Sequence, residues 1–234
     1  SMKAIVVAEN GGPEVLQYRD ADVPAVGPKQ VLIRVAAASV NFADIKERIG
    51  FYGTRKPPFI PGLDATGTIE AVGSEVSGLK EGQRVIALTT ATYAEYAVAD
   101  EMLTFPISDN VDLETAAACP VVAFTSYHLL AKCARVQKGE SVLIHAGAGG
   151  IGTTSIQLAK LLGAGKVIAT VGSDEKAKVA FEAGADVVIN YNQSKISGKV
   201  MEITNQQGVD VVLDSLAGDV FQESMKCLAR YGRL

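Results

Sequence analysis

The second half of the chain alternates uniformly apolar runs with segments in which apolar residues recur every three or four positions. The apolar runs predict strands buried on both faces, over residues 142–144, 166–171, 186–190 and 209–213. The periodic segments predict helices over residues 151–162, 173–183, 195–206 and 219–230. Alternation at this spacing implies right-handed crossovers and a doubly wound parallel sheet, a Rossmann-like α/β architecture.

The first half follows a different pattern of short strand-like runs separated by Gly-Pro turn signals. The runs cover residues 4–8, 30–35, 65–72, 84–88 and 93–98, and one helix is expected over residues 42–48. Their irregular spacing predicts a mostly antiparallel, partly open β-barrel. The whole chain is therefore expected to combine a β-rich domain with an α/β domain.

Three glycines connect the first strand of the second half to its helix, in the order Gly147-x-Gly149-x-x-Gly152. A glycine triplet alone is weak evidence, but here the required strand, turn and helix are all expected around it. Gly147 then allows the tight turn, Gly149 lets the backbone approach a pyrophosphate, and Gly152 lets the helix pack on the strand. Gly150 and Ile151 complete this predicted dinucleotide site; a turn without a ligand is the alternative.

Helical character begins between Pro106 and Pro120, where Asp112 is placed to cap a short helix and Pro120 to open a longer one. The predicted domains are a β-rich substrate or catalytic domain, residues 1–119, and a dinucleotide-binding domain, residues 120–234. A cofactor is expected in the cleft between them, where hydride chemistry on a small molecule is the natural use.

Composition excludes several other classes of protein. The net charge is −4, from 22 basic and 26 acidic residues, and no basic tract marks a nucleic-acid partner. The longest uncharged stretch, residues 115–131, is shorter than the roughly 20 apolar residues of a membrane span. The N-terminus lacks a secretory pattern, so a cytoplasmic protein is expected. The three cysteines, Cys119, Cys133 and Cys227, fit neither a disulfide framework nor a structural zinc site and are expected to be buried.

Five short motifs run in order along the chain: residues 11–16 (GGPEVL), 39–44 (SVNFAD), 61–67 (PGLDATG), 93–96 (YAEY) and 145–152 (HAGAGGIG). Together they resemble the zinc-independent quinone oxidoreductase branch of the medium-chain dehydrogenase/reductase superfamily. The resemblance runs from Lys3 to Leu234. It implies a GroES-like barrel, an NADPH-dependent reductase of quinones or other conjugated carbonyls, and a homodimer in the full-length form.

Zinc ligands are expected to be missing. In the alcohol dehydrogenases of this superfamily, a cysteine and a histidine hold the catalytic zinc at positions that fall on Asn41 and Leu63. An amide and an alkyl side chain do not replace these ligands. The resemblance therefore implies that no metal is bound and that hydrogen bonds polarise the substrate carbonyl.

The resemblance makes Asn41 a candidate for contact with substrate or ribose, since this position faces the nicotinamide in related reductases. Asn41 could equally cap the helix that begins at Phe42, together with Asp44. Lys46 stands where many relatives have tyrosine. Lys46, Tyr52 and Tyr93 are candidate proton donors, and for each a surface or packing role is the alternative.

The second predicted strand of the α/β domain ends without the acidic residue that binds the ribose hydroxyls of NAD, which favours NADPH. Ser173, Lys176 and Tyr191 match positions that bind the 2′-phosphate in NADPH-dependent relatives. A helix cap at Ser173 and a solvated face at Lys176 are the alternatives. Asp174 and Glu175 are nearby acids that could weaken the preference.

Three further residues complete the expectations. The resemblance places Thr125 near the nicotinamide half of the cofactor, with helix capping or packing as the alternative. His145 and His128 are not expected to act as bases, and His145 is predicted to be a core residue of the first strand.

Residues 231–234 end where the fifth strand of the sheet is expected to begin, which leaves the dinucleotide-binding domain incomplete in its second half. Two other functions stay open. One is an enoyl-thioester or alkenal reductase, and the other is a cofactor-binding protein without turnover.

Overall fold

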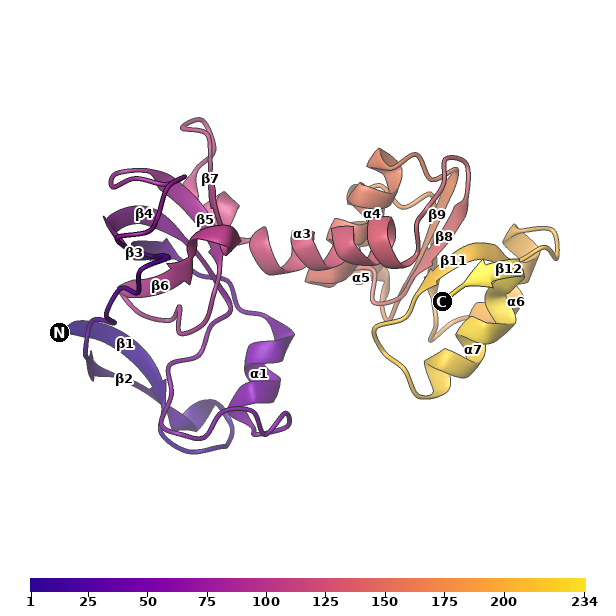
Figure 1. The fold of residues 1–234 in the computed structure, drawn as a ribbon. Helices are drawn as coiled ribbons and strands as arrows, with labels where there is room; N and C mark the ends of the chain where they lie inside the picture. The colour runs from indigo at the N-terminus through magenta and orange to yellow at the C-terminus, as the bar shows by residue number, and fades with distance from the viewer. The chain divides into compact units, whose positions relative to one another are not determined.

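A computed structural model describes residues 1–234, which divide into two compact units, residues 1–121 and residues 122–234 (Figure 1). Unit 1 is antiparallel. A two-stranded sheet pairs β1 (Met2–Val7) with β2 (Leu16–Ala21). A five-stranded sheet has the order β6-β3-β4-β5-β7 and consists of β3 (Gln30–Ala37), β4 (Asp64–Val72), β5 (Arg84–Leu88), β6 (Tyr96–Asp100) and β7 (Thr104–Pro106).

Alternating side chains of the five-stranded sheet form the core of unit 1. Val31 and Ile33 of β3 pack with Ile69 of β4 and Val85 of β5, as the period of two along each strand requires. Unit 1 also contains two α-helices, α1 (Phe42–Arg48) and α2 (Leu113–Ala117). Asp112 caps α2, since its carboxylate accepts the backbone N–H groups of the second and third helical residues at 2.9 and 3.0 Å.

Unit 2 is a parallel five-stranded sheet with helices on both faces (Figure 1). The strand order is β10-β9-β8-β11-β12, from β8 (Ser141–Ile144), β9 (Lys166–Val171), β10 (Val187–Asn190), β11 (Val209–Leu213) and β12 (Leu228–Arg233). The helices are α3 (Pro120–Tyr127), a π-helical segment (His128–Cys133), α4 (Gly150–Leu161), α5 (Asp174–Glu182), α6 (Ile196–Ile203) and α7 (Asp219–Cys227).

The uniformly apolar strands are explained by burial on both faces of this sheet. On one face Ile144 of β8 packs with Ile156 of α4. On the other face Leu143, the preceding residue of β8, packs with Ile196 and Val200 of α6. Neighbouring residues of one strand therefore enter different cores, and neither position tolerates a polar side chain.

The fold class expected from the sequence is confirmed: an antiparallel β-rich unit precedes a Rossmann-like parallel sheet. The predicted bounds of β5, β9, β11 and α1 agree with the structure. Two strands, β2 and β7, were not predicted. Of the three cysteines expected to be buried, only Cys227 is buried, whereas Cys119 and Cys133 are exposed. No helix of the structure has both the length and the apolar character needed to span a membrane.

The end of the chain differs from the prediction. The last predicted helix ends at Cys227, and a fifth strand, which was expected only after residues 231–234, already begins at Leu228. β12 pairs with β11 in parallel. The pairing requires close backbone approach, since a Cβ on Gly232 would lie 3.0 Å from the carbonyl oxygen of Val209. The helix predicted over residues 195–206 also ends early, because Asn205 and Gln206 adopt positive φ angles.

Candidate functional site

The turn between β8 and α4 is built around its glycines. A Cβ on Gly152 would lie 2.2 Å from the carbonyl oxygen of Ala146, and a Cβ on Gly147 would lie 2.7 Å from the Cβ of Ala169. At both positions, any side chain would collide with neighbouring atoms. Gly149 is the N-cap of α4, with φ −80° and ψ 172°. Glycines thus let the turn lie directly against the strand and the helix.

The N-terminus of α4 has no side-chain cap. The N–H groups of the first helical residues, Gly150, Ile151 and Gly152, have no acceptor within the helix. They point out of its positive end, where a pyrophosphate is stabilised both by hydrogen bonds and by the helix dipole. The turn therefore fits the phosphates of a dinucleotide.

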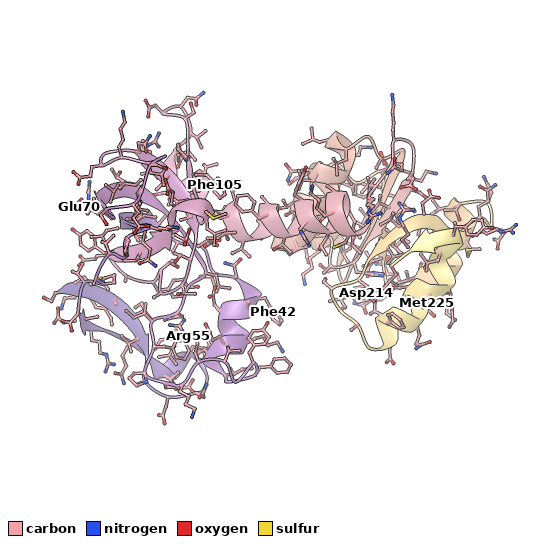
Figure 2. The ribbon with its side chains drawn as sticks, in the orientation of Figure 1. Phe42, Arg55, Glu70, Phe105, Asp214 and Met225 are labelled. Carbon is pink, nitrogen blue, oxygen red and sulfur yellow. The ribbon has the colours of Figure 1, made fainter.

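The order of strands in unit 2 reverses between β8 and β11, and this is where ligands bind in doubly wound sheets. A cavity of about 360 Å³ lies at the carboxyl ends of these two strands. Its lining includes Ile144, Ile151, Leu213 and Asp214. Figure 2 shows Asp214 in the segment that leads from β11 to α7. The cavity and the glycine turn adjoin each other, because Ile151 belongs to both.

The sequence suggested that His145 lies within the first strand, but in the structure it directly follows β8. The ring is 2 % exposed, and its Nδ1 and Nε2 atoms each lie 2.8 Å from a hydroxyl oxygen, of Thr170 and Ser224 respectively. Burial lowers the pKa of His145, while the nearby carboxylate of Asp214 acts in the opposite direction. Both ring nitrogens are engaged within the core, so the ring is not poised to act as a base.

A second group of predicted cofactor residues gathers at the carboxyl end of β9. Ser173 is the N-cap of α5, and its hydroxyl accepts the backbone N–H of Lys176 at 3.3 Å. The phenol of Tyr191 covers Gly172, where a Cβ would lie 2.5 Å from the phenolic oxygen. The side chain of Lys176 is exposed beside them. The structure brings Ser173, Lys176 and Tyr191 to the same end of the sheet.

Thr125 lies on the exposed side of α3. Its neighbour Ser126 is buried and accepts a hydrogen bond from the hydroxyl of Ser155 at 3.0 Å, which ties α3 to α4. The helix that carries Thr125 is therefore fixed against the helix that follows the glycine turn.

Asn41 lies in a buried polar cluster of unit 1. Its side-chain amide donates to the hydroxyl of Ser39 at 3.0 Å and to the carboxylate of Asp64 at 3.5 Å. The backbone N–H of Asn41 donates to the carboxylate of Asp44 at 2.8 Å. Asn41 and Asp44 thus form a capping box at the start of α1, in which each side chain accepts the backbone N–H of the other residue. The amide nitrogen of Asn41 is directed toward Asp64.

Asp64 is the centre of this cluster, although no sequence argument singled it out. The side chain is 1 % exposed and accepts hydrogen bonds from the hydroxyl of Ser39 at 2.7 Å and from the backbone N–H of Val121 at 3.2 Å. Val121 lies in the first turn of α3, where a carboxylate also stabilises the helix dipole. The only sequence signal was an acid in an otherwise apolar strand start.

Tyr93, one of the candidate proton donors, belongs to the same cluster. Its hydroxyl donates to Asp44 at 3.0 Å. Burial raises the pKa of Tyr93, and the carboxylate of Asp44 raises it further. Burial also raises the pKa of Asp44. A phenol that is buried against a carboxylate is a poor acid, so this environment suits a structural hydrogen bond.

Lys46 and Tyr52 lie among exposed aromatic side chains at α1. The ammonium of Lys46 is 5.2 Å from the ring centre of Phe42 and 4.5 Å from that of Phe51. Tyr52 packs edge-on against Phe51, with 5.5 Å between the ring centres. Figure 2 shows Phe42 projecting from α1. No hydrogen bond joins Asn41 to Lys46 or Tyr52, so the structure does not join the three predicted catalytic residues through direct bonds.

The residues at the superfamily's catalytic zinc positions do not suit the metal. The amide of Asn41 is already directed to Ser39 and Asp64, and Leu63 has no donor atom. No group of three or more His, Cys, Asp or Glu side chains is placed to hold a metal ion.

Both units of the chain match described protein families. Residues 27–109 match the family described as alcohol dehydrogenase GroES-like domain, and residues 150–234 match the family described as zinc-binding dehydrogenase. This order of domains defines a medium-chain dehydrogenase/reductase. The second family's name includes zinc, but its matched residues contain neither Asn41 nor Leu63.

Individual relatives place the chain more closely. The quinone oxidoreductase of Rattus norvegicus is 39% identical over all of this chain and 72% of its own length. The crystal structure of the Pseudomonas syringae pv. tomato quinone oxidoreductase is 38% identical, has a TM-score of 0.94, and matches 99% of this chain and 72% of that chain. The Escherichia coli quinone oxidoreductase, solved as a complex with NADPH, is 34% identical with a TM-score of 0.91, over 98% of this chain and 71% of that chain. The chain therefore belongs to the quinone oxidoreductase family of the medium-chain dehydrogenases/reductases, a family of oxidoreductase enzymes.

Proposed function

We propose that this protein is an NADPH-dependent, zinc-independent reductase of quinones or other conjugated carbonyl compounds. The observation that carries the proposal is the uncapped N-terminus of α4 behind a turn that only glycine can form. When bound there, reduced nicotinamide supplies a hydride, and together with one proton from a donor or from water it reduces the substrate by two electrons. The protein's part is to bind, orient and protonate.

The end of β9 supports NADPH as the coenzyme. NAD-binding sheets place an acid at this point to bind the ribose hydroxyls, but here the chain continues as Gly172-Ser173. A hydroxyl, an ammonium and a phenol, from Ser173, Lys176 and Tyr191, can instead donate hydrogen bonds to a 2′-phosphate. The Escherichia coli relative with NADPH supports the same choice.

The side chains around Asn41 support a reaction without zinc. With no ligand set for the metal, the substrate oxygen has to be polarised by hydrogen-bond donors. Asn41 is proposed to contact the substrate or the ribose. Lys46 and Tyr52 are the proposed proton donors, because Tyr52 is exposed, Lys46 is partly exposed, and neither is held by a buried carboxylate. Thr125 is proposed to line the nicotinamide half of the site.

The proposal is tested by binding first and turnover second. Thermal-shift titrations with NADPH and NADH are expected to show the larger stabilisation with NADPH. Oxidation of NADPH is then followed with a quinone, an enone and an enoyl thioester, with and without a zinc chelator. Quinone reduction that survives the chelator is the expected result, and a stronger response to NADH or loss of activity with the chelator contradicts the proposal.

The same panel separates the remaining alternatives. Faster turnover of the enoyl thioester identifies an enoyl reductase. Binding of NADPH without its oxidation by any substrate identifies a coenzyme-binding protein. Cytoplasmic location stays a prediction from the N-terminal sequence, and a homodimer of the full-length form stays a prediction from the resemblance. Sedimentation of the full-length protein tests the homodimer.

A further inference from the structure

Asp174, the first residue of α5, has its carboxylate held by two side-chain amides. The amide of Asn190 donates to Oδ1 of Asp174 at 2.9 Å. The amide of Gln193 donates to the same oxygen at 3.1 Å and to Oδ2 at 3.3 Å. Asn190 is the last residue of β10, and Gln193 lies in the turn that follows it. Two amides from one short segment, the end of β10 and the turn after it, thus converge on one carboxylate.

This carboxylate stands where a negative charge would oppose the proposed coenzyme. Asp174 directly follows the helix cap Ser173 and precedes Lys176 by two residues. A carboxylate in the first turn stabilises the helix dipole, but it repels a phosphate that binds at the same helix end. The direction of the Asp174 carboxylate therefore bears on how well this end of the sheet can accept a 2′-phosphate.

We propose that Asn190 and Gln193 form a clamp that holds the carboxylate of Asp174 against the turn after β10 and thereby sets the preference for NADPH over NADH. The proposal rests on the proposed NADPH function and adds the residues that protect its phosphate site. Both amides donate to Asp174, which fixes the direction of its side chain while the carboxylate keeps its charge. A released carboxylate can rotate toward Ser173 and Lys176 and compete for the lysine.

The turn after β10 has its own attachment, which makes the clamp separable from the rest of the site. The side-chain amide of Asn192 donates to the carbonyl oxygen of Gly172 at 2.7 Å. The ring of Tyr191 packs over the same glycine. Removing the side chains of Asn190 and Gln193 leaves these two contacts with Gly172, but it also removes the hydrogen bond that the side-chain oxygen of Asn190 accepts from the backbone N–H of Asn192 at 3.1 Å.

The experiment measures the dissociation constants of NADPH and NADH from coenzyme fluorescence at fixed ionic strength. The double variant Asn190→Ala, Gln193→Met removes both amides. Its affinity for NADPH is expected to fall about tenfold, with NADH binding unchanged within about twofold, because NADH carries no 2′-phosphate. When Asp174→Asn is added, the double substitution is expected to lose its effect. The control adds Glu175→Gln to the double variant instead, which removes a neighbouring charge outside the clamp. The loss of NADPH affinity is expected to remain in this control.

Three results would overturn the clamp while leaving the proposed function intact. These are an equal loss of affinity for both coenzymes, no loss for either, and a loss that persists with Asn at position 174. Wild-type protein that binds neither coenzyme, or prefers NADH, overturns the proposed function and the clamp together. The measurement on the wild type is therefore made first.

Discussion

The Nε2 atom of His145 lies 2.8 Å from the hydroxyl oxygen of Ser224. This contact joins the end of β8 to the middle of α7, while Nδ1 of the same ring contacts Thr170 of β9. The imidazole thus connects three elements of unit 2 beside the cavity at the sheet's edge. A buried imidazole that connects elements in this way stabilises the unit most when it is neutral.

The stability of unit 2 is therefore expected to depend on pH through His145. Burial lowers its folded-state pKa below the ordinary value of 6.5. Below pH 6.5 the unfolded chain binds the proton more readily, so the free energy of unfolding falls as the pH decreases toward the folded-state pKa. The contribution is at most about 1.4 kcal/mol per pH unit. Urea unfolding of wild type and His145→Gln between pH 7.5 and about 5 measures it.

His145→Gln is expected to be less stable at neutral pH but to lose less stability on acidification. A buried amide does not take up a proton in this range, so this part of the pH dependence disappears. Equal slopes for the two proteins would show that the imidazole is not the titrating group.

Gly152→Ala is expected to destabilise unit 2 by about 1–3 kcal/mol and to weaken NADPH binding. The added methyl group meets the carbonyl oxygen of Ala146 at 2.2 Å, and this contact is with backbone, which has little freedom to move. Gly198→Ala is the matched control, since this helical glycine has no atom within 4 Å of an added Cβ. The control is expected to gain about 0.5–1 kcal/mol. Urea unfolding and coenzyme titration of both variants test the pair, and the idea fails if both behave alike.

Elements that bury most of their side chains were predictable, and elements with few buried side chains were not. Every residue of β9 except the first is buried, so its sequence is apolar and its bounds were clear. In contrast, β2 reads LQYRDA, is almost entirely exposed, and pairs only with β1. β12 contains two arginines and an exposed tyrosine, and its pairing with β11 overrides the helical pattern.

The same distinction applies to the candidate site. The glycine turn is local, so its spacing shows its geometry, and all three glycines lie in one short segment. The cluster around Asp64 joins residues 23 to 57 positions apart, and the clamp on Asp174 joins residues 16 and 19 apart. No local pattern reports such contacts, because they depend on how the strands and helices fold together. Sequence alone therefore identified Asp174 as an opposing charge but not the amides that hold it.

Asp64→Asn is expected to destabilise unit 1 by about 2–4 kcal/mol. The carboxylate accepts hydrogen bonds from a hydroxyl and from the backbone N–H groups of Ser39 and Val121, and the amide replaces one acceptor oxygen with a donor. Asp100→Asn is the control, because this exposed cap accepts one backbone N–H group and its loss costs about 1 kcal/mol or less. Hydrogen exchange of the β4 amides reports the stability of unit 1 directly. Similar protection in the two variants would contradict a central role for Asp64.

Lys176→Ala is expected to reduce affinity for NADPH about tenfold or more and to leave affinity for NADH unchanged, because a lysine–phosphate hydrogen bond contributes about 1.5–3 kcal/mol. The matched control is Lys178→Ala, which removes another exposed lysine of α5 and keeps the net charge equal to that of the first variant. If Lys176 contacts the 2′-phosphate directly, NADPH binding by its variant also depends less steeply on salt, since one ion pair is missing. Fluorescence titrations at two salt concentrations check both expectations. Equal effects of the two lysines would indicate a general attraction of charge, and the assignment of Lys176 to the phosphate would then be wrong.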